Sequence, residues 1–179
     1  MLVIILTEQK KILMVIAQEN FRDEEFLKPK KVFEDSGAKV TVASNTTKKA
    51  KGVLGKKVSP DISISDVNID DYDAISITGG GGAKQYLWDN KELQEIVRKA
   101  NEQGKIIGAI CIAPVVLANA GLLEGKMTTV FKNEETVKIL KDNDAKYRDK
   151  DVMVDGNIIT GRDPNAANKY GQAVIKALK

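Results

Sequence analysis

Residues 106–114 read Ile106-Ile107-Gly108-Ala109-Ile110-Cys111-Ile112-Ala113-Pro114 and contain the only cysteine of this 179-residue chain. The run 106–110 is apolar without alternation, which is typical of a strand buried on both faces of a sheet. Pro114 opens a second apolar run that ends at Gly121, and a proline in the first turn with a glycine beyond the end is typical of a helix. Cys111 therefore lies at a predicted strand-to-helix turn.

The residues around Cys111 are small where such a turn needs them to be small. A sharp strand-to-helix turn crowds the positions two before and two after its central residue, and these are Ala109 and Ala113. This spacing favours a nucleophile elbow, in which a strained turn holds up a reactive side chain. A helix N-terminus there would favour the thiolate. The alternative is a cysteine that serves only as a small buried hydrophobe.

Four consecutive glycines, 79–82, follow an apolar stretch that predicts a strand over 73–78. Glycine lets backbone N–H groups approach a ligand closely, and successive N–H groups form a hollow that binds anions. Beside a nucleophile this hollow would act as an oxyanion hole. The alternative is a flexible turn without a function.

An acidic stretch, residues 19–25, follows the apolar run 12–17, which predicts another buried strand. Carboxylates are favourable in the first turn of a helix, so most of these acids are predicted to begin one. In a doubly wound sheet, functional groups collect at the carboxyl ends of the strands. One carboxylate could therefore reach Cys111, because all three features follow predicted strands.

Length and patterning predict one α/β domain, residues 11–179, preceded by an N-terminal extension, residues 1–10. We expect the extension to be disordered or loosely docked, with an extra edge strand as the alternative; it is too short to cross a membrane and shows no signal peptide. The predicted strands are 11–17, 39–43, 73–78, 105–110, and a hairpin formed by 152–154 and 157–160, with irregular β structure over 52–67 in which Ile62 and Ile64 alternate. The predicted helices are 23–36, 84–88, 91–103, 114–120, 133–141 and 164–178.

Composition excludes several classes of function. Lys and Arg total 28 against 25 acids, which gives a net charge of +3 and no nucleic-acid signature. The chain has no histidine and a single cysteine, so no metal site is expected, and no internal disulfide is possible. A lone cysteine fits a reducing cytoplasm. We expect no cofactor, no nucleic-acid partner and no membrane association.

The order of these features resembles the ThiJ/PfpI superfamily, whose fold is like that of class I glutamine amidotransferases. The similar stretches are Glu25 four residues before Pro29, the glycines 79–81, residues 109–121, and residues 154–164. The resemblance implies a flavodoxin-like three-layer sandwich, with a mostly parallel sheet, helices on both faces, and assembly as a homo-oligomer.

The resemblance also implies roles for individual residues. Cys111 matches the elbow nucleophile, and Glu25 matches the acid that hydrogen-bonds its sulfur. Gly80 and Ile112 match the backbone donors of the oxyanion hole. PfpI-type peptidases have a histidine where this chain has Ile112, and another branch has one where this chain reads Thr128-Thr129-Val130. The chain therefore lacks the catalytic histidine of both branches.

Three functions remain open at this point. The favoured one is a thiol-dependent enzyme, similar to glyoxalases or deglycases, that acts on small reactive carbonyl or acyl substrates. It would be a hydrolase or a glyoxalase-like lyase and would serve in a stress response. The first alternative is a PfpI-type intracellular cysteine peptidase with a peptide substrate, which needs a proton carrier. The second is a non-enzymatic redox sensor or chaperone-like protein. We expect Asn20, Arg162 and Asp163 at the rim of the site.

Overall fold

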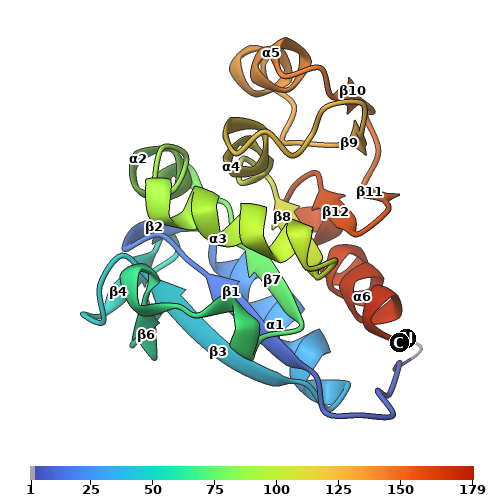
Figure 1. Ribbon diagram of the computed structural model, residues 1–179. Coiled ribbons are helices and arrows are strands. Elements are labelled where there is room, and N and C mark those ends of the chain that lie inside the picture. The colour runs from blue at the N-terminus through green and yellow to red at the C-terminus, as the bar shows by residue number, and fades with distance from the viewer. Residues whose placement is uncertain (1–2) are drawn as a thin grey trace.

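A computed structural model describes residues 3–179 of the chain and shows one central sheet of seven strands (Figure 1). Every neighbouring pair in this sheet is parallel except the hairpin pair at one edge. In spatial order the strands are β11 (Val152–Asp155), β12 (Ile158–Gly161), β8 (Ile106–Ile110), β7 (Ala74–Ile77), β1 (Lys11–Val15), β3 (Lys39–Ser44) and β6 (Ile62–Ser63).

Helices cover both faces of the sheet, which gives the expected flavodoxin-like three-layer sandwich (Figure 1). The helices α1 (Asp23–Asp35) and α6 (Ala167–Leu178) pack together on one face. The helices α3 (Lys91–Glu102) and α4 (Pro114–Asn119) pack together on the other. Two further helices, α2 (Gly81–Tyr86) and α5 (Glu134–Asp142), lie beyond the carboxyl ends of the strands (Figure 1).

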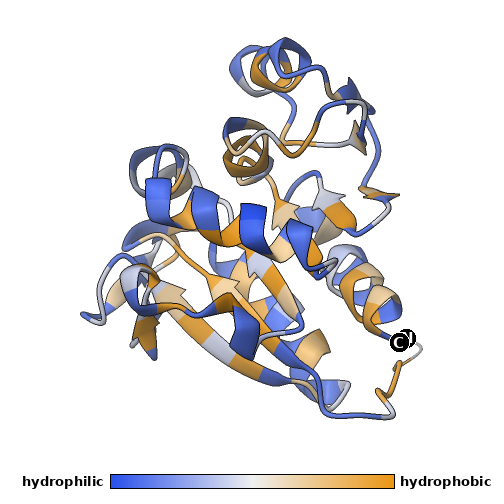
Figure 2. Cartoon of the chain, viewed as in Figure 1, coloured by the Kyte–Doolittle hydropathy of each residue, from blue (hydrophilic) through white to orange (hydrophobic). Residues whose placement is uncertain are grey.

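The core lies between these layers because the central strands are apolar on both faces. Strands β1, β7 and β8 are buried along almost their whole length, and Figure 2 shows them as a hydrophobic centre behind a hydrophilic outer surface. Helix α3 turns Leu93, Val97 and Ala100 toward the sheet and its charged side chains toward solvent. Val15, Ile77 and Ala109 are aligned across β1, β7 and β8, so the segments that follow these strands meet at one edge.

Two small sheets accompany the central one, and of their strands only β5 (Lys57–Val58) falls within the irregular β structure expected over 52–67. One joins β2 (Glu19–Phe21), β4 (Ala50–Gly52) and β5, and the other pairs β9 (Met127–Thr128) with β10 (Lys146–Tyr147). The carboxylate of Asp23 anchors the β4–β5 hairpin, because it accepts the N–H groups of Leu54 and Lys56, both at 2.8 Å.

The predicted elements are otherwise present, with boundaries shifted by a few residues. The expected alternation in residues 52–67 is wrong at Ile64, which begins a 3₁₀ turn, η1 (Ile64–Asp66), directly after β6. Helix α2 begins at Gly81 and not at residue 84, because the glycine run itself forms its first turn after Gly80. The last predicted helix divides into a 3₁₀ turn, η3 (Pro164–Ala166), and α6. A further 3₁₀ turn, η2 (Ile69–Asp71), precedes β7.

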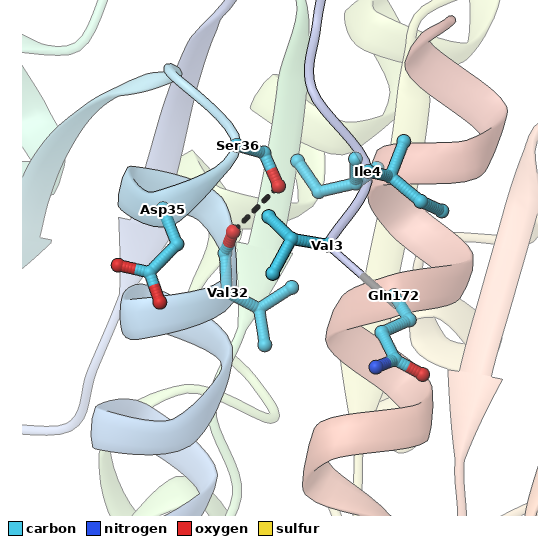
Figure 3. A pocket seen from close by; sticks show the side chains of 7 residues that line it. Val3, Ile4, Val32, Asp35, Ser36 and Gln172 are labelled. Atoms are coloured by element: carbon cyan, nitrogen blue, oxygen red, sulfur yellow. Dashed lines mark hydrogen bonds between the residues drawn. The ribbon is translucent and has the colours of Figure 1, made fainter. Parts of the chain in front are cut away.

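The start of the described chain lies in the groove between α1 and α6 (Figure 3). Residues 3–10 form neither helix nor strand, so they do not add the extra edge strand considered above. Leu6 is 9% exposed and donates its N–H to the carbonyl of Ser36 at 3.0 Å. The cavity left beside Val3 and Ile4 is about 20 Å³, enough for about one water molecule. The chain's own N-terminal segment therefore fills this groove.

Candidate active site

Cys111 occupies a strained turn at the carboxyl end of β8. Its φ is +64°, a left-handed conformation that a cysteine adopts at a cost of order 1–3 kcal/mol. Hydrogen bonds on both sides hold it there: its N–H donates to the carbonyl of Gly161 at 2.9 Å, and its own carbonyl accepts the N–H of Phe131 at 2.7 Å. Ala109 and Ala113 are fully buried. The expected elbow geometry is thus present, with the cysteine 7% exposed.

Glu25 reaches this turn from the first turn of α1. Its side chain is 1% exposed, and its Oε2 accepts the N–H of Gly79 at 3.0 Å. Oε1 is buried and has no partner with full hydrogen-bond geometry among the described residues. The carboxyl group lies close enough to the Cys111 thiol for the two groups to interact through a proton. The acid and the thiol that the sequence singled out therefore lie on either side of Gly79 and line the same cavity.

The glycines fit because the site leaves no room for side chains. A Cβ on Gly79 would come within 2.6 Å of the Glu25 carboxylate and 2.7 Å of the Cys111 Cβ. Gly80 has a φ of +96° and lies directly against the backbone of residues 20–22. The N–H groups of Gly80 and Ile112 face the sulfur, where each stabilises a negative charge. The resemblance assigned these two N–H groups to an oxyanion hole, and that role stays a prediction.

Burial dominates the acid–base behaviour of the pair. Desolvation raises the pKa of Glu25 from 4.5 to about 7, although the nearby Cys111 thiol and the N–H of Gly79 act in the opposite direction. Burial, followed by the charge of Glu25, also raises the pKa of the Cys111 thiol. The expectation that the turn would favour the thiolate is wrong here, because desolvation and the charge of Glu25 raise the thiol pKa more than the backbone donors lower it.

A cavity of about 680 Å³ opens above the pair. Asn20 lines it, as the sequence led us to expect. Arg162 and Asp163 do not, and their placement at the rim is corrected: Arg162 is turned to Asp149, Asp151 and Asp163 in a separate surface cluster, with N–O distances of 3.2, 2.5 and 3.2 Å. The cavity is lined by Asn20, Arg22, Glu25, Val53, Gly80, Gly81, Gly82, Gln85, Cys111, Ile112, Phe131, Asn133 and Pro164.

Sequence reasoning missed several of these lining residues. Arg22 lies three residues before Glu25, about one helical turn, and that spacing could have placed both at one opening. Asn133 stands at the start of the helix predicted over 133–141, and it caps α5: its side chain accepts the N–H of Thr136 at 2.8 Å. Gln85 and Phe131 carried no signal, because only the folded chain brings their segments to Cys111.

No group of three or more potential metal-ligating His, Cys, Asp or Glu side chains occurs within residues 3–179. Over the same range, no helix combines the length and the apolar character that crossing a membrane requires.

The fold and the site define an α/β protein with a cysteine on a strand-to-helix elbow and a buried glutamate beside it. The model of the DJ-1/PfpI family matches residues 10–177, and the chain belongs to this family. It is 48% identical to the uncharacterized protein MJ0967 of Methanocaldococcus jannaschii over 94% of this chain and 82% of that protein. It is 31% identical to the deglycase PfpI of Pyrococcus furiosus, over 94% of this chain and 99% of that one.

A solved structure has the same architecture. The ThiJ/PfpI domain protein from Brachyspira murdochii superposes with a TM-score of 0.91 at 31% identity, covering 96% of this chain and 97% of that one. The fold and family inferred from the sequence are confirmed by these comparisons, whereas the activity of this chain is a separate question.

Proposed function

We propose that this protein is a cysteine-dependent enzyme that converts small 2-oxoaldehydes, or their adducts, to 2-hydroxy acids. The observation that carries the proposal is the placement of Cys111 and the buried Glu25 beside Gly79 in one cavity, where burial raises the pKa of Glu25 to about 7. A proton carrier is most effective when its pKa lies near the working pH. The names of several relatives, among them the deglycase PfpI of Pyrococcus furiosus, are in keeping with chemistry on reactive carbonyls.

The first step is addition of the thiol to the aldehyde. Glu25 in its ionised form takes the thiol proton, and the sulfur forms a bond to the aldehyde carbon while the carbonyl electron pair moves to oxygen. The N–H groups of Gly80 and Ile112 stabilise that oxyanion. Glu25 then returns the proton to the oxygen, which gives a neutral hemithioacetal and restores the carboxylate.

The second step moves a hydrogen between adjacent carbons. Glu25 takes the proton from the carbon bonded to sulfur, and the electron pair reduces the neighbouring ketone through an enediol. Return of the proton to that neighbouring carbon leaves a thioester of a 2-hydroxy acid. Water hydrolyses the thioester and releases the free thiol, so the net reaction consumes one aldehyde and one water and needs no external oxidant.

Methylglyoxal consumption, measured together with lactate formation, tests this proposal. We expect turnover by the wild-type protein, no turnover by Cys111→Ser, and a kcat roughly 10²–10⁴-fold lower for Glu25→Gln. Glu34→Gln removes a carboxyl group from the exposed side of the same helix and serves as the matched control. A wild-type rate no higher than that of Cys111→Ser refutes the enzyme proposal.

The same material separates the two alternatives. Hydrolysis of peptides that depends on Cys111, without methylglyoxal turnover, would favour the peptidase. Stepwise oxygen addition at Cys111 under mild peroxide, without turnover of either substrate, would favour the redox sensor.

Two further properties belong to this proposal. A cytoplasmic location is supported by the single cysteine, which remains a free thiol. A homo-oligomer is expected from the family resemblance, and light scattering tests it by asking whether the mass in solution is a multiple of 19.6 kDa.

A further inference from the structure

One charged side chain in the cavity has no part in the chemistry proposed above. Arg22 is the only Lys or Arg among the described residues that line the cavity around Cys111. The other polar side chains there, apart from Glu25, are the neutral amides Asn20, Gln85 and Asn133. The single fixed positive charge of this cavity therefore belongs to Arg22.

The backbone of Arg22 is fixed against the glycine loop that carries the oxyanion donor. Its N–H donates to the carbonyl of Gly79 at 3.0 Å, and its carbonyl accepts the N–H of Phe26 at 3.3 Å as α1 begins. A Cβ on Gly80 would collide with the Arg22 nitrogen. The α-carbon of Arg22 thus stands beside the site at which an oxyanion would form.

The guanidinium group is held in one orientation and still has unused donors. Its Nε and Nη2 bind the two carboxylate oxygens of Glu24 at 2.6 and 3.1 Å. These contacts occupy two of the five N–H bonds of an arginine, so the Nη1 edge is free of described protein partners. The side chain is 36% exposed. An arginine oriented in this way is preorganised for a second carboxylate, since less rotamer freedom is lost when the ligand binds.

Its charge also acts on the reacting groups. The positive charge of Arg22 lowers the pKa of Glu25 against the larger effect of burial, and the negative charges of Glu24 and Glu25 raise the pKa of Arg22 in turn. Arg22, Glu25 and Cys111 all line the same cavity. One small molecule in a cavity of about 680 Å³ could therefore contact Arg22 and Cys111 together.

We propose that Arg22 selects 2-oxoaldehydes that carry a carboxylate, by binding that carboxylate while the aldehyde meets Cys111. This inference rests on the proposed function and specifies its substrate class. A carboxylate fits better than a more highly charged anion because Glu24 and Glu25 both lie beside Arg22. A ligand that binds the Nη1 edge leaves both hydrogen bonds of the Arg22–Glu24 pair in place, so no existing contact has to be broken.

Kinetics with a matched pair of substrates test the inference. The pair is 4,5-dioxopentanoate and 2-oxopentanal, which share the 2-oxoaldehyde and differ in a terminal carboxylate against a methyl group. We expect wild-type protein to prefer the acid. Arg22→Gln is expected to lower the ratio of the two kcat/KM values roughly 10- to 100-fold, mainly through KM for the acid, because a charge-assisted contact is lost. Arg22→Lys is expected to restore part of the ratio, since it keeps the charge without the planar fork.

Lys30→Met is the control, because it removes one positive charge from an exposed position of α1 where Lys30 pairs only with Glu34. It should leave the ratio unchanged. If Arg22→Gln turns over both substrates with the wild-type ratio, the inference is overturned while the proposed enzyme survives.

A binding arm keeps the inference testable if no substrate is turned over. The Cys111→Ser protein is titrated calorimetrically with 4-oxopentanoate, which has the carboxylate but no aldehyde, and with neutral 2-pentanone. We expect the acid to bind at least about tenfold more tightly, and we expect adding Arg22→Gln to abolish the difference. Equal affinity for the two probes, or a difference that persists without Arg22, overturns the inference whatever the outcome for catalysis.

Discussion

Replacing Glu25 by glutamine removes the titration of the buried carboxyl group and keeps its shape. The amide oxygen can still accept the N–H of Gly79, and the amide nitrogen can donate to the sulfur of Cys111. In the wild-type protein, burial raises the pKa of Glu25 from 4.5 to about 7. Between these two values the folded chain holds a proton that the unfolded chain has released. Stability therefore falls as the pH rises through this window.

The size of this effect follows from the pKa values. At about 1.4 kcal/mol per pKa unit, the rise from 4.5 to about 7 destabilises the folded wild-type protein above pH 7 by roughly 3 kcal/mol relative to acidic solution. Glutamine carries no such penalty. We therefore expect the free energy of unfolding of Glu25→Gln, taken relative to that of the wild type, to be roughly 3 kcal/mol higher at about pH 8.5 than at about pH 5. This difference corresponds to roughly 6–12 °C in Tm for a chain of this length.

Urea unfolding of both proteins at the two pH values measures the change directly. Glu24→Gln is the control, because the Arg22 guanidinium holds the pKa of Glu24 below its usual range and the group stays ionised throughout the window. Its difference from wild type should be the same at both pH values. If the difference between Glu25→Gln and wild type is also independent of pH, Glu25 titrates like an exposed carboxyl group and the reasoning about its burial is wrong.

Three other changes have defined outcomes. In Glu25→Gln, iodoacetamide should alkylate Cys111 faster than in wild type above pH 7, because the charge that raises the thiol pKa is gone, and an unchanged rate would show that Glu25 does not act on the sulfur. Asp23→Ala should cost roughly 2–4 kcal/mol in urea unfolding, because two N–H groups of the β4–β5 turn lose a buried carboxylate acceptor; a cost below about 1 kcal/mol would contradict this anchoring. Trp88→Phe removes the 2.8 Å hydrogen bond from Nε1 to the carbonyl of Ile112 and should cost about 1–2 kcal/mol by the same assay, whereas unchanged stability would show that water replaces the indole.

The features that the sequence predicted correctly are those encoded by neighbouring residues. The small residues Ala109 and Ala113, two positions before and after Cys111, indicate a crowded turn. The structure places Cys111 at a positive φ in that turn. The helix predicted over 133–141 is present as α5, and Asn133 forms a capping box with Thr136 at its start. The pair Asp155-Gly156 was predicted as a hairpin turn, and it joins β11 to β12 with Gly156 at a φ of +60°.

The features that the sequence did not predict are set by distant segments. Strand β2 exists because β4, from another part of the chain, pairs with it, and a three-residue strand has no periodicity of its own. The prediction of a favoured thiolate at Cys111 is wrong for the same reason, because desolvation by the whole fold raises the thiol pKa more than the local helix terminus lowers it. Arg162 was misplaced because three nearby carboxylates pair with it and hold it away from the cavity.

This site has no histidine, but it contains another group that titrates near neutral pH. An unperturbed histidine titrates near pH 6.5, and the pKa of Glu25 is raised to about 7 by burial. A carboxyl group with this pKa can release and take up a proton near neutral pH as an imidazole does. The charged forms of the two groups differ in sign, however. The ionised carboxylate of Glu25 is negative and destabilises the thiolate, whereas a protonated imidazole is positive and would stabilise it. On the proposed mechanism the thiol therefore stays protonated until substrate arrives and gives up its proton only as the new bond to carbon forms. The rate of turnover should accordingly rise with pH as Glu25 ionises near pH 7, a profile that Glu25→Gln should lack.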